Sequence, residues 1–504
     1  MNRALRYKMP DQHKLESLYY LLTAFICLAA RFYLLPQIGL TDYDSIRSWQ
    51  IVQELGQGNF KHLFHHASPG FFLLYAVFTP FLKGVLGYIL LNSLFNVGAV
   101  LLLIRFMRQH LAVPLPEAFL TGLIFGLSVF AVSTGRNFAT ESISIFLFML
   151  MLEQYYRRLH HKSAHAFLKA AAWLALGLTI NYKLLLVFPI ILLIELFQRD
   201  KVLSPKLLLK LALIILAPFV LFGLIAVLVN KPFYQFPATI VSINHFTRPT
   251  PALRTGRFNL DWEYYGRYLL DFEWPVLLPA LFLFPFLYRQ QLFSFKGQKL
   301  NIYQFLFIIS YLYLLGMQLL VKAPRGLMFV YGLFYALTYL VLNYIIPKRW
   351  VILVILFSGI SYQVYQLNKN IYLYAPTNYP AVVKYLEENN IAKVVTTVGL
   401  NIVPHTTGKA IETKIIFSEK ELPALKQAGF THVLLDDYYK ITNVQQFAGL
   451  EKIKTEKDWP EPTLLSPLLY LDHSEFTGLS YTQTLANQRK AQKSSVQLRL
   501  IKIP

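Results

Sequence analysis

Side chains able to exchange protons are concentrated in the first long polar stretch of the chain, residues 41–70. The stretch carries two aspartates and three histidines: Asp42, Asp44, His62, His65 and His66. Carboxylates and imidazoles take up and release protons during reactions, so we interpret this stretch as an active site rather than a tether. Capping of the helical pattern that follows is the alternative for the two aspartates. The histidine spacing favours solvated side chains at the membrane interface, and we predict no metal site.

The composition is that of a membrane protein. Of 504 residues, 55% are hydrophobic and only 15% are charged, with a mean hydropathy of +0.43. Soluble domains have about a quarter of their residues charged. The net charge of +21 is explained first by basic cytoplasmic loops, so we predict no nucleic-acid partner. The single cysteine, Cys27, forms no intramolecular disulfide and has a packing role.

Apolar runs of roughly 18 to 22 residues recur along the chain, long enough to cross the hydrocarbon. Because lysine and arginine mark cytoplasmic loops, pairs of spans must separate successive basic clusters. The predicted spans are 15–36, 84–104, 116–134, 141–156, 166–181, 184–198, 207–229, 273–288, 301–320, 326–346 and 350–367. This gives about eleven spans, the first uncleaved, with the N-terminus in the cytoplasm. The apolar piece at 69–82 is assigned to the outer surface, because a further span there would place Arg105 and Arg108 outside.

Several cations fall on the external side, against the charge rule for topology. They are Lys183, Lys231, Arg248, Arg254, Arg257, Arg267, Lys322 and Arg325. A short external turn adds Arg136 and Glu141, for which a simple ion pair is the alternative. External loops carry some cations by chance, but so many near the outer surface indicate an anionic ligand such as a lipid phosphate.

The chain divides into a membrane domain, residues 1–367, and a soluble extracytoplasmic α/β domain, residues 368–504. The first external loop of the membrane domain covers about residues 37–84. In the soluble domain we predict helices at 381–390 and 419–430 and strands at 393–399, 431–439 and 495–503. Asp436 and Asp437 are interpreted as a solvated edge or turn. No glycine-rich loop follows the first strand, so no nucleotide site is predicted.

The order of motifs on the external side is informative. Gly58 follows the Asp44-Ser45 pair, and His66 and Pro69-Gly70 then precede an aromatic, apolar helix. Two further segments come next, STGRNFATESISIFLFML and LALGLTINYKLLLVFP. This succession resembles the GT-C glycosyltransferases that depend on polyprenyl phosphates. It is most similar to the branch with protein O-mannosyltransferases and the lipid A aminoarabinose transferase, in layout over residues 15–345 and in motif over residues 40–200.

The resemblance implies a fold and a reaction. The fold is an α-helical polytopic membrane domain of the GT-C type with a small C-terminal α/β domain. The reaction moves a sugar, with inversion, from a polyprenyl-phosphate donor to a lipid, glycan or protein acceptor at the outer face of the inner membrane. Membrane lipids are further partners, and no cofactor is implied. The alternative is a transporter or flippase of lipid-linked sugars, but the chain shows no repeat and its unusual charges lie at the outer interface.

The resemblance also assigns roles to residues. Asp44 matches the family's acid and is the predicted base, with Asp42 as a second acid; Ser45 stands where relatives carry a glutamate. The predicted substrate-binding residues are Arg136, Glu141, Lys183, Arg248, Arg254, Arg257, Lys322, Arg325, His65 and His66. Among them, Lys183, Arg325 and the arginines of the 248–257 loop are expected to bind phosphate, and Arg136 and Glu141 to orient donor or acceptor. A His-Ala-Ser-Pro-Gly sequence replaces the family's His-Pro-Pro, so the part played by His65 and His66 stays open.

Overall fold

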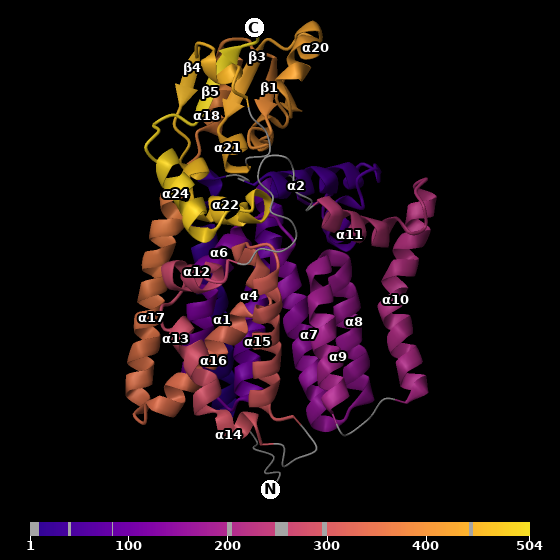
Figure 1. Ribbon diagram of the computed structural model, residues 1–504, viewed down its shortest axis with the longest axis vertical. Coiled ribbons are helices and arrows are strands. Elements are labelled where there is room, and N and C mark those ends of the chain that lie inside the picture. Colours follow the sequence, from indigo (N-terminus) through magenta and orange to yellow (C-terminus); the bar gives the residue numbers. More distant parts are fainter. Residues whose placement is uncertain are drawn as a thin grey trace.

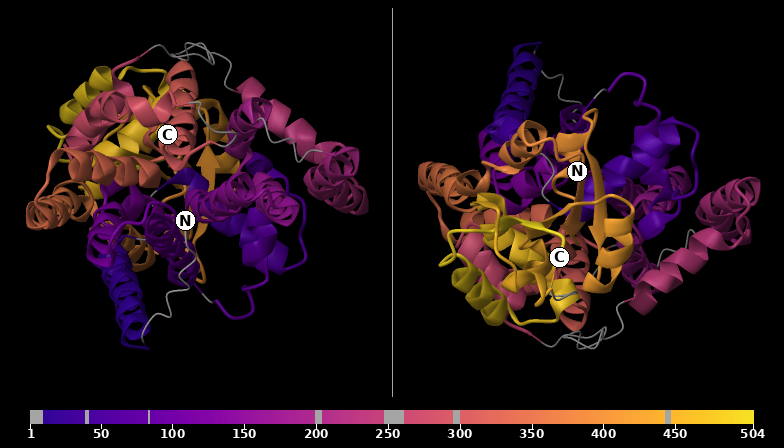
Figure 2. Two further views of the ribbon diagram at one scale, coloured as in Figure 1. Left: turned by 90° about the horizontal axis from the view of Figure 1, so that it is seen from below. Right: turned by 90° about the horizontal axis from the view of Figure 1, so that it is seen from above.

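The computed structural model describes residues 10–38, 42–82, 84–198, 204–246, 261–294, 300–442 and 447–504. Long helices run side by side and form a bundle, and a small sheet domain sits on one end of it (Figures 1 and 2). The helices of the bundle are α1 Pro10–Phe32, α4 Val85–His110, α5 Leu115–Gly126, α6 Val129–Arg136, α7 Glu141–His161, α8 Ala164–Ile180, α9 Val187–Phe197, α10 Pro205–Leu228, α12 Tyr264–Phe272, α13 Leu277–Leu287, α14 Arg289–Leu292, α15 Ile302–Leu319, α16 Tyr331–Ile345 and α17 Arg349–Asn370. The short 3-10 helices η3 Tyr182–Leu186 and η4 Pro324–Leu327 begin just before α9 and α16.

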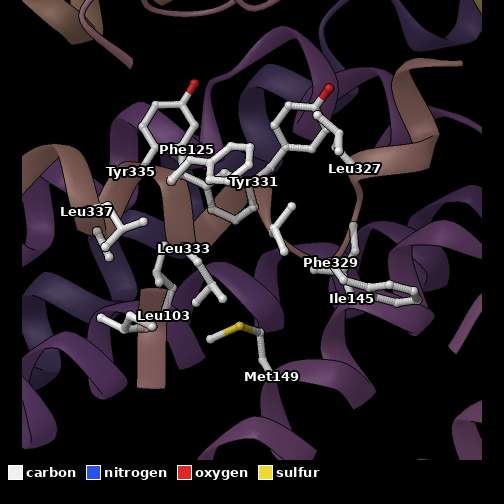
Figure 3. Close-up of a cluster of buried hydrophobic side chains, with 14 of the residues drawn as sticks. Leu103, Phe125, Ile145, Met149, Leu327, Phe329, Tyr331, Leu333, Tyr335 and Leu337 are labelled. Atoms are coloured by element: carbon white, nitrogen blue, oxygen red, sulfur yellow. The ribbon is translucent and has the colours of Figure 1, made fainter. Parts of the chain in front are cut away.

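Each predicted span is occupied by helix. Within the described residues, five helices are long and apolar enough to cross a membrane, or up to seven if each bent pair is one span. The total of about eleven stays a prediction, because α8, α9 and α16 are shorter than the roughly 20 residues a perpendicular span needs. The bundle encloses a dense apolar core around α16, into which Phe125, Leu103 and Met149 pack from α5, α4 and α7 (Figure 3).

The first polar loop forms a layer between the bundle and the sheet domain. It contains α2 Tyr43–Gly56, η2 His65–Ala67 and α3 Pro69–Ala76, and α2 lies across the end of the bundle (Figure 1). Eight helical residues extend about 12 Å, so α3 cannot span the membrane, as the charge pattern predicted. Close packing fixes its place, because a Cβ on Gly70 would lie 2.1 Å from Thr179 Oγ1 of α8. Helix α11, Gln235–Phe246, packs against η2 in the same layer.

Two spans are broken close to this layer. Helices α5 and α6 meet at a bend of 58°, and α12 and α13 at 119°. Ser128 begins α6, where its side chain accepts the Ala131 N–H. The fully buried Arg31 donates hydrogen bonds to the carbonyls of Gly126 (3.0 Å) and Ala131 (3.2 Å), which flank the first bend. Unpaired carbonyls are costly inside a membrane, so Arg31 is a structural side chain.

The sheet domain has a mixed sheet of five strands in the order β2-β1-β3-β5-β4. They are β1 Lys393–Thr397, β2 Glu412–Ile416, β3 His432–Asp436, β4 Lys457–Trp459 and β5 Leu498–Lys502. Its helices are α18 Tyr379–Glu388, α19 Val403–Thr406, α20 Leu422–Gln427, α21 Tyr438–Thr442, α22 Pro467–Asp472, α23 Ser474–Thr477 and α24 Tyr481–Ala491; the 3-10 helices η5 Tyr372–Tyr374, η6 Glu419–Glu421, η7 Leu450–Lys452 and η8 Pro462–Leu465 complete it. Strands β2 and β3 flank β1 in parallel, while β5 pairs antiparallel with β3 and β4. The partly parallel sheet and its three predicted strands agree with the sequence; the edge strands β2 and β4 were not predicted.

Asp436 departs from its predicted place at a solvated edge. The side chain is 1% exposed and accepts hydrogen bonds from the Tyr379 hydroxyl and the Tyr438 N–H. Burial raises the pKa of this carboxyl to about 7. The prediction was wrong because β3 lies inside the sheet, flanked by β1 and β5, and Tyr438, just after β3, contacts Tyr43 and Asp42 of the first loop.

Candidate active site

A cavity of about 110 Å³ lies where α6, the start of α2 and the α22 segment of the sheet domain meet. In Figure 1, α22 is seen between the sheet and the bundle, directly over α6 and α12. Acids, arginines, hydroxyls, amides and aromatic rings line the cavity: Asp42, Glu141, Asp472, Arg136, Arg325, Ser133, Thr134, Asn137, Asn370, Thr463, Ser466, Phe130, Tyr268 and Tyr374, with Ile38, Ala139, Pro324, Ile371, Leu468 and Leu469. Such a mixture suits a polyhydroxylated ligand.

The two aspartates of the first loop occupy the start of α2. Asp42 stands at the N-cap position, but its side chain makes no capping hydrogen bond there. Its Oδ1 lies 3.3 Å from the Tyr438 hydroxyl and 3.6 Å from His473 Nε2, both in the sheet domain. Burial and the neighbouring Asp44 charge raise the pKa of Asp42. A carboxylate with a raised pKa suits acid–base work.

Asp44 follows in the first turn of α2, where a negative charge is favoured by the helix dipole. Its Oδ1 is 3.6 Å from His66 Nε2, and its side chain is 30% exposed. The charge of Asp44 also acts on Arg325 and Tyr182. The charges of both aspartates thus act on Arg325, and Asp42 also lines the cavity.

Arg325 and Lys183 converge on one carboxylate of the sheet domain. Arg325, in η4, donates to Glu475, and Lys183 Nζ lies 3.7 Å from the second oxygen of the same carboxylate. Arg325 is also 4.0 Å from Glu141. Burial would raise the pKa of Glu475, but Arg325 and Lys183 lower it to about 2. Two cations thus hold a permanent anion at the edge of the cavity.

Arg136 reaches the cavity from the end of α6. One of its terminal nitrogens, Nη1, donates to the carbonyls of Arg31 (2.9 Å) and Tyr33 (2.5 Å), and its guanidinium lies 5.4 Å from the centre of the Tyr372 ring. Its Nη2 is buried without a protein partner, which leaves one charged donor for a ligand. Arg136 and Glu141 do not form the simple ion pair considered from sequence; the recorded partner of Glu141 is Arg325.

The histidines have separate roles. His62 pairs with Glu54 at 2.6 Å, away from the aspartates. His66 adopts φ of 49° and lies beside Asp44, and the His65 ring packs against it with centroids 4.0 Å apart. Burial lowers the pKa of His65 to about 3, and its Nε2 has no protein partner. Across the described residues, no three His, Cys, Asp or Glu side chains cluster closely enough to hold a metal ion.

Lys322 lies apart from the convergent cations. Its ammonium donates to the carbonyls of Met317 (3.2 Å), Gln318 (2.6 Å) and Leu320 (2.8 Å), at the end of α15. Burial lowers its pKa to about 8. The side chain therefore caps a helix rather than facing Arg325. Three further predicted residues, Arg248, Arg254 and Arg257, lie outside the described residues.

Sequence reasoning missed the contribution of the sheet domain. Asp472, His473 and Glu475 belong to one segment, at the end of α22 and the start of α23. Burial raises the pKa of Asp472 to about 7, against the influence of Arg325. The available signal was the run Asp-His-Ser-Glu directly after an apolar stretch, SPLLYL.

Comparisons with known proteins agree with this geometry. A family described as "Dolichyl-phosphate-mannose-protein mannosyltransferase" matches residues 66–222. The structure of ArnT from Cupriavidus metallidurans bound to undecaprenyl phosphate is 14% identical, with a TM-score of 0.53 over 90% of this chain and 84% of that one. ArnT from the same organism in the apo state is 11% identical, with a TM-score of 0.57 over 97% and 98% of the two chains. No curated protein matches the sequence.

These findings define the class of protein. The chain is a membrane glycosyltransferase with a GT-C type fold, as the order of its motifs predicted. Within that class it is similar to the protein mannosyltransferase family and, in its fold, to ArnT.

Proposed function

We propose that this protein transfers a sugar from a polyprenyl-phosphate donor to an acceptor hydroxyl or amine. The convergence of Arg325 and Lys183 on one anion, beside the Asp42–Asp44 pair and a polar cavity, carries this proposal. The similar ArnT structure holds undecaprenyl phosphate, a lipid whose headgroup these two cations would suit.

The donor phosphate binds Arg325 and Lys183, with the arginines of the 248–257 loop as additional contacts. The acceptor oxygen or nitrogen attacks the anomeric carbon while Asp44 takes its proton. The bond from that carbon to the phosphate oxygen breaks, and the electron pair leaves with the phosphate, whose charge the two cations stabilise. A single displacement of this kind inverts the anomeric configuration.

We assign the base to Asp44, because it is the more exposed of the pair (30% against 17%) and its charge acts on Arg325. Asp42 is the second acid. It lies in the cavity wall beside Tyr438 and His473 of the sheet domain. Arg136, through its free Nη2, and Glu141 orient the ligand in the cavity. His65 and His66 border Asp44 on the side of η2.

The positions of the basic residues also support one orientation of the protein in the membrane. Arg105 and Arg157 pair with Glu153 of α7, and Arg158 pairs with Glu195 of α9. Helices α7 and α8 are joined at the end of the bundle far from the sheet domain (Figure 1). The charge rule assigns that end to the cytoplasm. The sheet domain and the cavity are then extracytoplasmic, and the chain is a protein of the inner membrane. The choice among lipid, glycan and protein acceptors rests with the residues of the cavity wall.

The test is sugar transfer by purified protein in lipid vesicles, with polyprenyl-phosphate donors labelled in the sugar and a panel of lipid, glycan and peptide acceptors. Asp44→Asn should lower kcat roughly 10²–10⁴-fold and leave binding of undecaprenyl phosphate intact. The matched control is Asp458→Asn, an exposed acid of β4. Wild-type turnover by the Asp44→Asn variant would refute the assigned base. Movement of labelled donor across the vesicle without transfer would establish a flippase instead.

A further inference from the structure

Three side chains from opposite ends of the sequence form one hydrogen-bonded chain. Asp42 comes from the first loop, whereas Tyr438 begins α21 and His473 follows α22 in the sheet domain. The Tyr438 hydroxyl lies 2.7 Å from His473 Nε2 and 3.3 Å from Asp42 Oδ1. It also accepts the Tyr43 N–H at 3.2 Å. All three side chains are largely or fully buried, so water does not replace these contacts freely.

The hydrogen bonds define where the protons lie. His473 Nδ1 is 2.7 Å from the Leu469 carbonyl, which can only accept, so Nδ1 carries a proton. In the neutral imidazole Nε2 is then the acceptor, and the single proton of Tyr438 points to it. The Tyr438 oxygen is left facing Asp42 Oδ1 with a lone pair. In this arrangement the chain is complete when Asp42 holds a proton and donates it to Tyr438; when Asp42 is a carboxylate, the Tyr438 hydroxyl donates to Asp42 Oδ1 instead.

The same atoms support a second arrangement. When the Asp42 proton passes to the Tyr438 oxygen and the Tyr438 proton passes to His473 Nε2, the products are a carboxylate, a neutral tyrosine and an imidazolium. No proton or charge is lost in this exchange. Both arrangements satisfy every hydrogen bond of the chain, which is the requirement for transfer through it.

We propose that Tyr438 and His473 are positioning residues that draw the acceptor proton away from the Asp42–Asp44 pair, through Asp42 to the His473 imidazole. This inference rests on the proposed function of the pair. It gives the sheet domain a part in the reaction: Asp42 regains its carboxylate form beside Asp44 while the proton is held on His473. The buried site thereby avoids keeping a proton on both acids.

Other charged groups face this chain and enter its pH dependence. Asp44 faces it from α2, Glu141 from α7 and Arg325 from η4; Asp472 and Glu475 are neighbours on the same segment as His473. Burial raises the pKa of Asp472 to about 7, so its carboxyl could produce a pH dependence of its own. Asp472→Asn is therefore a necessary comparison.

The kinetic test uses Tyr438→Phe and His473→Gln in the donor and acceptor pair on which the wild type turns over. Each variant should lower kcat about tenfold or more while the Kd for undecaprenyl phosphate and the unfolding temperature stay at wild-type values. The wild-type rate should rise with pH, because a chain that already holds an extra proton cannot take up the proton of the acceptor. That rise should vanish in His473→Gln and persist in Asp472→Asn.

Matched controls come from neighbouring side chains of the same domain. Tyr439→Phe removes the adjacent hydroxyl, which donates to Glu451 and does not touch Asp42. His432→Gln removes a histidine that pairs with Glu456 at 3.2 Å. Both should keep the wild-type kcat and pH profile. Unchanged kcat in Tyr438→Phe, or a pH profile in His473→Gln that still rises as in the wild type, would overturn the proposal.

A spectroscopic arm separates this proposal from the proposed function. The infrared carbonyl band of protonated Asp42 can be assigned by its loss in Asp42→Asn. Its titration midpoint should move upward in His473→Gln, because His473 lowers the pKa of Asp42 and the substitution removes that influence. An unmoved midpoint would refute the chain even if sugar transfer is established. A moved midpoint without any sugar transfer would support the chain and refute the proposed reaction.

Discussion

Replacing Glu475 with glutamine removes the carboxylate that now neutralises the two cations proposed to bind the donor phosphate. Glutamine keeps the length and shape of the side chain, and its amide oxygen can still accept from Arg325. The charge is lost, and with it the attraction of Lys183 Nζ, which lies 3.7 Å away. The substitution therefore tests the electrostatic part of this contact between the sheet domain and the bundle.

The pKa of Glu475 gives the magnitude. It falls from an ordinary value of 4.5 to about 2, and each pKa unit corresponds to about 1.4 kcal/mol, so the folded state favours the carboxylate by roughly 3 kcal/mol. Because the folded pKa is depressed, this stability is fully present above about pH 4.5 and is lost as pH falls toward 2. Only 16% of the Glu475 side chain is exposed, so solvent screening reduces this free energy only slightly. At neutral pH we expect Glu475→Gln to lower the free energy of unfolding by about 1–3 kcal/mol, since one hydrogen bond is retained.

Donor binding should change in the opposite direction. In the wild-type protein the donor phosphate competes with Glu475 for Arg325 and Lys183. In the variant neither cation has that carboxylate as partner, and the phosphate gains the attraction. If the phosphate gains about 1.4 kcal/mol of the attraction that Arg325 and Lys183 now have for Glu475, the Kd for undecaprenyl phosphate will fall tenfold.

The assay pairs thermal unfolding in detergent with binding of undecaprenyl phosphate. Glu451→Gln is the matched control, because Glu451 pairs with Lys440 and Arg499 inside the sheet domain. It should leave donor binding unchanged. Donor affinity that falls together with stability in Glu475→Gln would show that the carboxylate is part of the donor site, and our reasoning would be refuted.

Two further substitutions separate binding from structure. Arg325→Gln should weaken undecaprenyl phosphate binding by about tenfold or more, since a charged hydrogen-bond donor to phosphate contributes roughly 1.5–3 kcal/mol. Lys322→Gln, by contrast, should lower the unfolding temperature and leave the Kd at its wild-type value. Equal effects of the two on Kd would contradict the assignment of Lys322 to the end of α15. Arg31→Met should cost about 1–3 kcal/mol for each buried carbonyl left without a partner and reduce folded yield, measured by size-exclusion chromatography; wild-type yield and stability would contradict its role at the α5–α6 bend.

The membrane part could be predicted because hydrophobic length and the sidedness of charge are properties of short segments. The 69–82 piece shows how far this reasoning goes. Its hydropathy alone suggested a span, the positions of Arg105 and Arg108 excluded one, and the structure has an eight-residue helix there. The parallel core of the sheet was predictable for a similar reason, since β1 and β3 are continuous buried runs.

The site was predicted only in part, because sequence assigns a cation to a side of the membrane but not to a partner. Lys183, Arg325 and Lys322 carried the same signal, yet the first two converge on Glu475 and the third caps its own helix. The sheet-domain contribution was out of reach for another reason. Asp42 and His473 are brought together by tertiary packing, and α23 is a helix of four residues with no periodicity to detect.

The orientation of the sheet explains how a soluble domain comes to complete a membrane site. Strands β1 and β3 run in parallel, so their carboxyl ends lie at one edge of the sheet, and loops at that edge are where α/β proteins place ligands. This end of the sheet faces the bundle: Leu400, after β1, packs against a buried cluster that includes Ile46 and Trp49 of α2, and Tyr438, after β3, reaches Asp42. A domain docked by its opposite edge would present neither. The end of the sheet that other α/β folds open to a soluble ligand here faces the bundle, which places Tyr438 and His473 beside Asp42 of the candidate site.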